Sequence, residues 1–363
     1  MPNGRARRGV TRTLILGAGF GGLTAATELA RLLPRGHEVT LVDERETFLM
    51  GLAKLSILDG RATRAQHERR LRDVERHGVR YHRGRVESID FDGKSATVSG
   101  ERLPYDHLVL ALGARLGPVP EGALSLYSLE GVEALHRELA RREEGRLLVA
   151  VSSLPFKCPP APYEAAMLAK AFRPRMHVTV ASPEPHPIPA GGAACGATIS
   201  EWIEERGVER RNGTPLEQAL ELPRDVLAVV PPHLPPAVLG AWVEADAATL
   251  ATKWRDVWAV GDCNVVKLAN GKPLVKAGVM AEGEAMVVAA NLAARVRGEP
   301  ETARFDGKGG CFLELGRGEA VEVRGDFYHQ PDPVVAAAGL PSRETLAAKW
   351  RWEEERLLRW FGA

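Results

Sequence analysis

Short apolar runs that alternate with amphipathic segments mark the beginning of the chain. The run from Thr13 to Leu16 ends in the loop GAGFGG, and a helical pattern from Leu23 to Leu33 follows it. His37–Asp43 (HEVTLVD) then has the composition of a second buried strand. Strand, glycine turn, helix and strand in this order are typical of a doubly wound parallel sheet.

Later segments repeat this alternation. Residues 78–111 contain several short strand-like runs, and a charged helix follows at 131–144. Arg146–Val151 begins a second strand-and-helix unit, and DVWAVGD at 256–262 reads as a buried strand that opens into a helix. A helical pattern extends over 278–297. The pattern predicts an α/β protein with two Rossmann-like dinucleotide-binding domains and a short C-terminal region.

Composition excludes several classes of protein. Lys and Arg total 48 against 47 Asp and Glu, and this balance argues against a nucleic-acid-binding surface. The four cysteines and ten histidines have no metal-ligand spacing, so no metal site is predicted. No apolar run is long enough to span a membrane, and the basic N-terminus has no signal-peptide core. We expect a cytoplasmic protein, with Arg5, Arg7 and Arg8 in a solvated tail.

The glycine loop is the first functional motif. Gly17, Gly19 and Gly22 form G-x-G-x-x-G between a strand and a helix. This spacing permits the tight turn, the approach of a diphosphate to the backbone, and close packing of helix on strand. Asp43 ends the next strand, 21 residues after Gly22, where a carboxylate binds the hydroxyls of an adenosine ribose. A dinucleotide without a 2′-phosphate is therefore expected.

The pair Gly261-Asp262 indicates which dinucleotide is bound. An Asp after a later buried strand can hold the sugar-alcohol chain of a flavin, and its alternative role is a helix cap. Together with GAGFGG, YDHLVLALGA and KAGVMAEGEA, the segment DVWAVGD resembles the two-dinucleotide-domain flavoprotein disulfide-reductase superfamily. The resemblance implies that Asp262 binds the ribityl chain of FAD. It also implies that the turn of Lys276, Ala277 and Gly278 directs a helix N-terminus at the flavin pyrimidine.

The resemblance also implies a domain organisation. The first part of the FAD-binding domain is expected at 10–118 and its second part at 241–300. A second dinucleotide-type domain is expected at 119–240, and a C-terminal region with a terminal helix at 301–363. In related flavoproteins the second domain binds NAD(P)H through its own glycine motif. Here no glycine occurs between Arg146 and Ala190, so nicotinamide binding is not expected.

A cysteine occupies the loop where those glycines would lie. The run CPPAPYE, which begins at Cys158, resembles sulfide:quinone oxidoreductases and the flavoprotein subunit of flavocytochrome c sulfide dehydrogenase. The segment CFLELGRGEAVEV places Cys311 where those families keep a partner cysteine. The resemblance implies a Cys158/Cys311 redox pair that oxidises sulfide, FAD that passes the electrons to a quinone or a cytochrome, and Glu164 as a base.

The residues around the cysteines support this chemistry. Lys157 and the helix start after Cys158 are expected to lower the pKa of that thiol. Cys311 follows Gly307, Gly309 and Gly310 in a loop that is expected to be mobile. Cys311 is therefore expected to hold the incoming sulfur and Cys158 to reduce the flavin. The alternative roles are a buried small side chain for Cys158 and a first-turn helix acid for Glu164.

Three departures from the family pattern limit the prediction. Residues 112–135 lack the additional cysteine of three-cysteine sulfide:quinone oxidoreductases, and the region FLMGLAKL offers no thiol, so FAD is expected to be non-covalent. Cys195 and Cys263 match no family role, and inert packing is expected for both. His107 is expected to be a satisfied core residue of a strand.

The last 22 residues read as a helix. Leu346, Trp350, Leu357, Trp360 and Phe361 lie on one side, which Glu353 interrupts. This side suits packing on the flavin domain or a homodimer contact, and peripheral contact with a membrane is the alternative. Three other functions remain open: a type II NADH dehydrogenase-like enzyme, a flavoprotein subunit that reduces a cytochrome c partner, and a non-catalytic FAD-stabilised binding protein.

Overall fold

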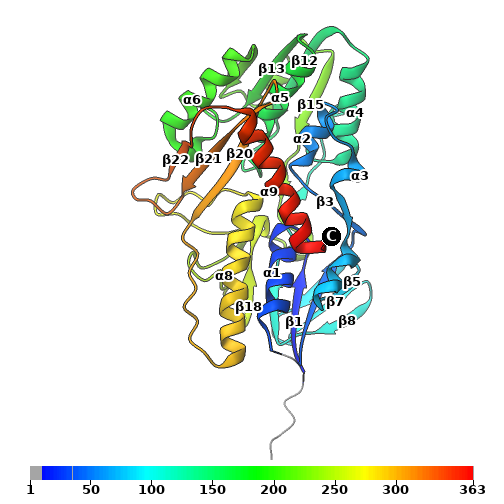
Figure 1. Cartoon of the computed structure of the whole chain (residues 1–363), viewed down its shortest axis with the longest axis vertical. Helices are drawn as coiled ribbons and strands as arrows, with labels where there is room; N and C mark the ends of the chain where they lie inside the picture. The colour runs from blue at the N-terminus through cyan, green and yellow to red at the C-terminus, as the bar shows by residue number, and fades with distance from the viewer. Residues whose placement is uncertain (1–9, 35, 363) are drawn as a thin grey trace, which may run out of the picture.

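A five-stranded parallel sheet forms the lower half of the molecule in Figure 1. The computed structural model describes residues 10–34 and 36–362, so the predicted solvated tail at Arg5, Arg7 and Arg8 lies outside the described residues. The strand order is β18-β9-β1-β2-β5. The bounds are β1 (Thr11–Leu16), β2 (His37–Asp43), β5 (Arg80–Arg83), β9 (His107–Leu110) and β18 (Val257–Ala259).

A second parallel sheet of five strands forms the upper half, with the order β11-β15-β12-β13-β14. Two doubly wound parallel sheets confirm the predicted fold class. The strand β18 returns from residue 257 to the first sheet, although the predicted domain limits themselves stay a prediction. The bounds are β11 (Leu124–Ser125), β12 (Glu144–Val151), β13 (Arg175–Ser182), β14 (Val208–Asn212) and β15 (Val226–Val230).

The remaining sheets are smaller, and all but one two-stranded pair are antiparallel. A meander in the first half contains β6 (Val86–Asp90), β7 (Ser95–Val98) and β8 (Glu101–Pro104), and the C-terminal sheet contains β20 (Lys308–Gly316), β21 (Glu319–Asp326) and β22 (Val334–Ala337). The antiparallel two-stranded pairs are β3 (Thr47–Leu49) with β4 (Glu68–Arg70) and β10 (Arg115–Leu116) with β16 (His233–Leu234), and the parallel pair is β17 (Val243–Glu244) with β19 (Asn264–Val265).

The helices cover these sheets. In Figure 1, α1 and α8 lie side by side, and α9 runs from the C-terminal sheet down to α1. The bounds are α1 (Phe20–Leu32), α2 (Ala53–Leu58), α3 (Arg64–His67), α4 (Leu129–Ala140), α5 (Ala161–Phe172), α6 (Gly192–Glu205), α7 (Leu216–Ala219), α8 (Gly278–Arg297) and α9 (Arg343–Phe361). The helix predicted over 278–297 is confirmed with the same bounds.

The helix α9 packs on the first sheet's domain, as expected, but with a different set of residues. Trp360 and Phe361 are fully buried, and the indole N–H of Trp360 donates to the hydroxyl of Thr24 on α1. The prediction was wrong for two positions: Trp350 is 44% exposed, and Glu353 is buried. Glu353 does not interrupt the packed face because it has a buried cationic partner on the same helix, described below.

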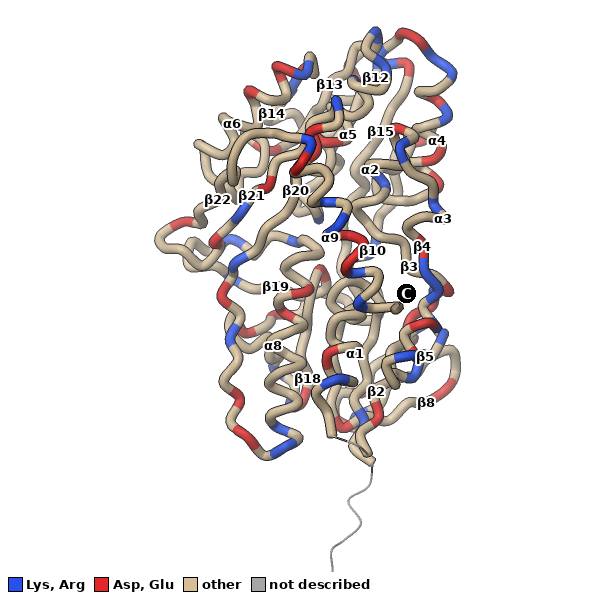
Figure 2. The backbone as a smooth tube through the Cα atoms, viewed as in Figure 1, with Lys and Arg blue, Asp and Glu red and all other residues tan. Residues whose placement is uncertain are grey.

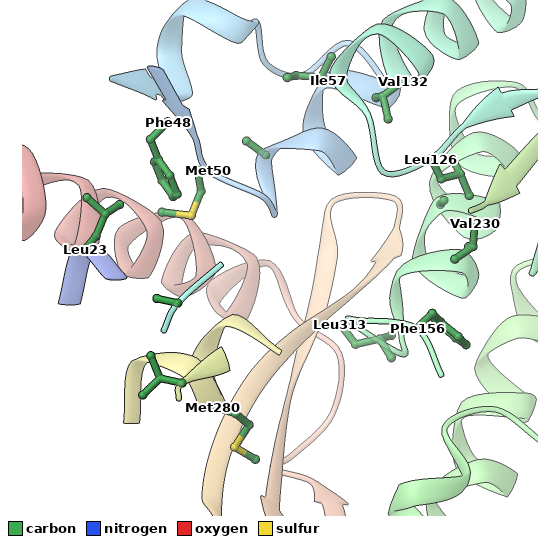
Figure 3. Close-up of a cluster of buried hydrophobic side chains, with 14 of the residues drawn as sticks. Leu23, Phe48, Met50, Ile57, Leu126, Val132, Phe156, Val230, Met280 and Leu313 are labelled. Atoms are coloured by element: carbon green, nitrogen blue, oxygen red, sulfur yellow. The ribbon is translucent and has the colours of Figure 1, made fainter. Parts of the chain in front are cut away.

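One hydrophobic cluster connects the two parallel sheets. It includes Phe48 and Met50 from the first half, and Leu126 and Val230 from the second (Figure 3). Charged residues of both signs are interspersed along the backbone (Figure 2). Among residues 10–34 and 36–362, no helix has the length and apolar character needed to cross a membrane.

Candidate functional site

The glycine loop between β1 and α1 forms a cradle that side chains would fill. Gly17 has φ +104°, and a Cβ atom there would lie 2.3 Å from the carbonyl oxygen of Ala111. A Cβ atom at Gly22 would lie 1.8 Å from the carbonyl oxygen of Gly17. At Gly19, in contrast, a Cβ atom would meet nothing within 4 Å, so the backbone there faces open space. This is the arrangement that a diphosphate needs at a helix N-terminus.

Asp43 lies at the end of β2, next to this loop. Its carboxylate accepts the backbone N–H of Ala18 at 2.7 Å and forms an ion pair with Arg45 at 2.8 Å. Burial raises the pKa of Asp43, but Arg45 and the Ala18 N–H outweigh burial and hold this pKa below its ordinary value. The carboxylate is therefore ionised. Because the Arg45 side chain is half exposed, it can turn aside and leave an acceptor for a ribose hydroxyl.

The segment after β18 differs from the prediction. Gly261–Cys263 is a single 3-10 turn, not the start of a helix. The buried carboxylate of Glu284 on α8 holds this turn, because it accepts the Gly261 N–H at 2.6 Å and the Asn264 side-chain amide at 2.9 Å. Burial raises the pKa of Glu284 to about 8. The sequence pattern did not single out Glu284, which lies within the KAGVMAEGEA motif.

Lys276 also supports the turn. Its buried ammonium donates to the carbonyl oxygens of Asp262 at 2.8 Å and Asn264 at 2.7 Å, and it lies 4.5 Å from the centre of the Trp242 ring. These contacts fix the backbone of Asp262. Its side chain is 15% exposed. The helix α8 begins at Gly278 after Ala277, and no side chain caps its N-terminus. Its free N–H groups are thus available to a negatively charged ligand.

These features fit FAD. The glycine cradle suits the diphosphate, Asp43 suits the adenosine ribose, and the partly exposed Asp262 suits a polyol chain. The uncapped N-terminus of α8 suits a flavin ring that gains negative charge when it is reduced.

The loop that carries Cys158 lies directly against the start of α8. The backbone N–H of Cys158 donates to the carbonyl oxygen of Lys276 at 2.7 Å. The hydroxyl of Tyr127 donates to the carbonyl oxygens of Lys157 at 2.6 Å and Cys158 at 3.3 Å, and Cys158 adopts a left-handed conformation with φ +52°. The thiol-bearing residue is thus fixed at three backbone points, beside the predicted flavin site.

Cys311 lies on β20, which packs on α5 immediately after the Cys158 loop. Leu313 of β20 and Phe156 of the Cys158 loop belong to the same cluster and lie together in Figure 3. The expected mobile loop at Cys311 is wrong, because Lys308–Gly316 is a strand of the C-terminal sheet and Cys311 pairs with Val323. Both cysteines are free thiols in the structure.

Glu164 lies in the first turn of α5, between the two cysteine segments. It is 2% exposed, and its carboxyl accepts the backbone N–H of Glu314 on β20 at 2.8 Å. Burial raises the pKa of Glu164 to about 8. The carboxyl therefore holds its proton at neutral pH and loses it just above, which is the range useful for proton transfer.

The thiol pKa values contradict the sequence-based expectation. Burial raises the pKa of Cys158 well above its ordinary value, and Cys311 and Glu164 add to this shift, while the Ala161 N–H and Lys157 oppose it only weakly. Burial likewise raises the pKa of Cys311 to about 12, with a contribution from Glu164. The helix start and Lys157 therefore do not outweigh desolvation. The packing of α5 on β20 and the hydrogen bond from the Glu314 N–H to Glu164 place Glu164 and Cys311 on adjoining elements, and the Cys158 loop leads directly into α5.

A buried ion cluster borders this site, and sequence patterns gave no signal for it. Lys349 of α9 is fully buried, forms an ion pair with Glu314 at 2.9 Å, and also pairs with Glu353 one turn along the helix. The second oxygen of Glu314 pairs with Arg61 at 2.6 Å. Burial lowers the pKa of Lys349, but its two carboxylate partners outweigh burial and raise it.

The remaining predicted residues are structural. Cys195 and Cys263 are buried, consistent with packing. His107 lies on β9 as expected, but it is not satisfied, because its Nδ1 is buried without a hydrogen-bond partner among the described residues. No group of three or more His, Cys, Asp or Glu side chains suited to a metal occurs in the described part of the chain.

Known proteins share this architecture. Residues 11–150 match the family model for pyridine nucleotide-disulphide oxidoreductases. The mitochondrial sulfide:quinone oxidoreductase of Mus musculus is 24% identical over 367 residues, which cover 88% of this chain and 78% of that protein. The demethylphylloquinone reductase NdbB of Synechocystis sp. is 32% identical over 149 residues, which cover 37% of this chain and 36% of that protein.

A solved structure extends the similarity to the fold of almost the whole chain. The sulfide:quinone oxidoreductase from the hyperthermophilic bacterium Aquifex aeolicus superposes with a TM-score of 0.82 at 19% identity, covering 97% of this chain and 91% of that one. The chain is thus an FAD-dependent oxidoreductase with two dinucleotide-type domains, similar over most of its length to the sulfide:quinone oxidoreductases.

Proposed function

We propose that this flavoprotein oxidises sulfide at a Cys158/Cys311 pair and passes the electrons through non-covalently bound FAD to a quinone. One observation carries the proposal: the backbone N–H of Cys158 donates a hydrogen bond to the Lys276 carbonyl just before α8. The strand β20, which contains Cys311, packs on α5, the helix that follows the Cys158 loop. This arrangement supports a two-thiol centre next to the flavin ring. The similarity to a mouse protein named sulfide:quinone oxidoreductase supports the same assignment.

The cycle begins from a Cys158–Cys311 disulfide, which forms when the two thiols lose two electrons and two protons. Hydrosulfide attacks the Cys311 sulfur, so an S–S bond forms there while the original S–S bond breaks and Cys158 leaves as a thiolate. The Cys158 sulfur then bonds to the added sulfur, giving a trisulfide, two electrons and one proton. Bound FAD supplies the chemistry of accepting two electrons and passing them to the quinone.

A base and a second hydrosulfide complete the cycle. Glu164, once deprotonated, accepts the proton that the added sulfur releases, because its carboxyl lies between the cysteine segments. A second hydrosulfide attacks the central sulfur of the trisulfide, so that its bond to Cys158 breaks and Cys158 leaves as a thiolate. This thiolate then attacks the Cys311 sulfur, which restores the disulfide and releases a hydrodisulfide anion. Both cysteines are partly buried, which limits the access of other reactants to the persulfidic sulfur and still admits hydrosulfide.

The test is anaerobic stopped-flow spectroscopy of the purified holoenzyme, which follows the loss of flavin absorbance after mixing with sulfide, NADH or NADPH. We expect rapid bleaching by sulfide and recovery of the colour on addition of a short-chain quinone. The proline-flanked loop around Cys158 has no glycine, so NADH is expected to bleach the flavin at a negligible rate. Comparable rates with NADH and sulfide would contradict the proposal and favour the NADH dehydrogenase-like function.

The acceptor also requires a test, because a quinone lies in a membrane and a cytochrome does not. Trp350 and Leu358 of α9 are 44% and 47% exposed and are the apolar residues of this helix that suit an interface with lipid. We therefore expect the holoenzyme to co-sediment with lipid vesicles. Substitution of both residues by serine should abolish co-sedimentation without changing sulfide-driven bleaching, and retained co-sedimentation would exclude this face of α9.

A further inference from the structure

His233, on the short strand β16, has no role in the chemistry above, yet its environment is unusual. The side chain is 5% exposed, and its Nδ1 lies 3.0 Å from the carbonyl oxygen of Pro231. A carbonyl oxygen can only accept a hydrogen bond, so Nδ1 must carry a proton. In the neutral ring, Nε2 then presents a lone pair and acts as an acceptor.

The Nε2 atom of His233 is buried and has no hydrogen-bond partner within residues 10–34 and 36–362. A buried acceptor without a donor is unfavourable, and most such atoms in folded proteins have a partner. A bound molecule with a donor group would satisfy it.

The surroundings of His233 indicate where that molecule lies. The ring meets Tyr127 edge to face, with 5.1 Å between the ring centres, and the Tyr127 hydroxyl holds the carbonyl of Lys157 in the Cys158 loop. The Lys157 ammonium lies 3.9 Å from the carboxylate of Asp262. Through Tyr127 and Lys157, His233 therefore lies next to the turn that contains Asp262, the residue expected to bind the ribityl chain of the flavin.

The ring stays neutral in this environment. Burial lowers the pKa of His233 to about 4, and the charge of Lys157 adds to this shift, while the Pro231 carbonyl and Asp262 oppose it. At neutral pH the Nε2 atom therefore remains an acceptor. Asp262 is an acceptor as well, so the molecule that both residues face should carry several hydroxyl donors, as a polyol does.

We propose that His233 Nε2 accepts a hydrogen bond from a ribityl hydroxyl of bound FAD, and so positions the flavin together with Asp262. The proposal rests on FAD binding and not on sulfide as the substrate.

The test measures FAD affinity in the absence of any substrate. Apoprotein is titrated with FAD and with analogues in which the 2′, 3′ or 4′ ribityl hydroxyl is replaced by hydrogen, and quenching of flavin fluorescence reports binding. For the wild type we expect one analogue to bind about fivefold to tenfold more weakly than FAD, the loss expected for one hydrogen bond. In His233→Phe, FAD should weaken by a similar factor, and that analogue should bind as well as FAD.

Three variants sharpen the result. His233→Gln retains a side-chain acceptor and should recover part of the affinity for FAD. His186→Phe is the matched control, because His186 also places Nδ1 near a proline carbonyl, that of Pro187 at 3.2 Å, and it should behave as the wild type. Lys157→Met should keep the wild-type ratio between FAD and the weakened analogue. Loss of the ratio there would mean that the Lys157 ammonium donates to that hydroxyl, and would overturn the assignment of His233 as its acceptor.

The proposal is overturned if His233→Phe binds FAD and every analogue with wild-type affinities. If that variant binds FAD normally but is reduced more slowly by sulfide, the donor is the sulfur substrate, which also overturns the ribityl assignment. A failure of sulfide to bleach the wild-type flavin would contradict only the proposed function, because the FAD titrations do not depend on it.

Discussion

At the scale of single residues, the two thiols are expected to have unequal roles. Cys158 lies against the first turn of α8, whereas Cys311 lies on a strand of the C-terminal sheet. Cys158→Ser should abolish sulfide-driven bleaching and leave FAD bound, because the residues expected to hold FAD are the glycine loop, Asp43 and Asp262. Cys311→Ser should also stop turnover. Stopped-flow absorbance checks both, with Cys195→Ser, a buried thiol outside the site, as the control. Wild-type turnover in Cys311→Ser would refute the paired-cysteine mechanism.

The proton affinity of Glu164 predicts a pH dependence. Because burial raises its pKa to about 8, the carboxyl is mostly protonated at pH 6 and 7, and its base form increases about tenfold per pH unit there. The rate of sulfide-driven bleaching, corrected for the hydrosulfide concentration, should therefore rise with pH and level off above about 8. Glu164→Gln should be slow and lack this rise. A corrected profile that is the same in both proteins would exclude Glu164 as the base.

The stability of the folded state should change with pH in the opposite direction to the rate, because of the raised pKa of Glu164. A carboxyl whose pKa is raised by folding binds more protons in the folded state than in the unfolded state. Its contribution to stability is fully present below the unfolded value and is lost as the pH rises through about 8. The same burial that raises the pKa of Glu164 into the range useful for proton transfer therefore makes the site less stable at alkaline pH.

At the scale of elements, the buried ion cluster connects α9 to the C-terminal sheet. Lys349 is the cation that Glu314 of β20 shares with Glu353 of α9. Lys349→Met leaves two buried carboxylates without this partner, and we expect a loss of about 3–5 kcal/mol in the free energy of unfolding. Urea unfolding of the holoenzyme measures it.

The control for that substitution is Arg64→Ala, which removes an exposed ion pair with Glu68 and should leave the unfolding midpoint unchanged. Combining Lys349→Met with Glu353→Gln removes one of the unpaired charges and should recover part of the loss. An unfolding midpoint for Lys349→Met equal to that of the wild type would show that Arg61 alone compensates Glu314.

Local patterns predicted the elements better than the contacts between them. The strand β2 and the helix α8 have the predicted bounds, because apolar periodicity and glycine turns are local signals. Glu353 reads as an interruption in the sequence because nothing local shows that Lys349, one turn away, is buried. The burial of Lys349 depends on its ion pair with Glu314, which comes from β20. Cys311 was placed in a loop because three nearby glycines favour one, whereas pairing with β21 makes the segment a strand.

The same limit applies to the thiols. Neighbouring charges and a helix start can be read from a sequence, and both favour a thiolate at Cys158. Burial cannot be read in this way, because it depends on α5, β20 and the loop before α8 coming together. In the folded chain burial is the largest influence on the pKa of Cys158, so the predicted direction was wrong.

At the scale of the whole molecule, FAD should act as a ligand of the folded state only. The glycine loop and Asp43 precede Asp262 by more than 200 residues in the sequence, and Asp262 joins them only when β18 completes the first sheet. A ligand bound at such a site stabilises the folded state in proportion to the logarithm of its free concentration. Thermal unfolding of the apoprotein should therefore begin at a lower temperature than that of the holoenzyme, and added FAD should raise it progressively.

The attachment of the cofactor follows from the residues of α2 and the segment before it. Met50 to Leu58 contain no cysteine, so no thiol there can form a bond to the flavin ring. Acid precipitation of the holoenzyme should release the yellow chromophore into the supernatant, and reconstitution of the pellet after refolding should require added FAD. Flavin that stays with the acid pellet through washing in denaturant would mean that another side chain is linked to it. In that case the temperature shift with added FAD should also be absent, because a covalently held cofactor does not exchange with the free pool.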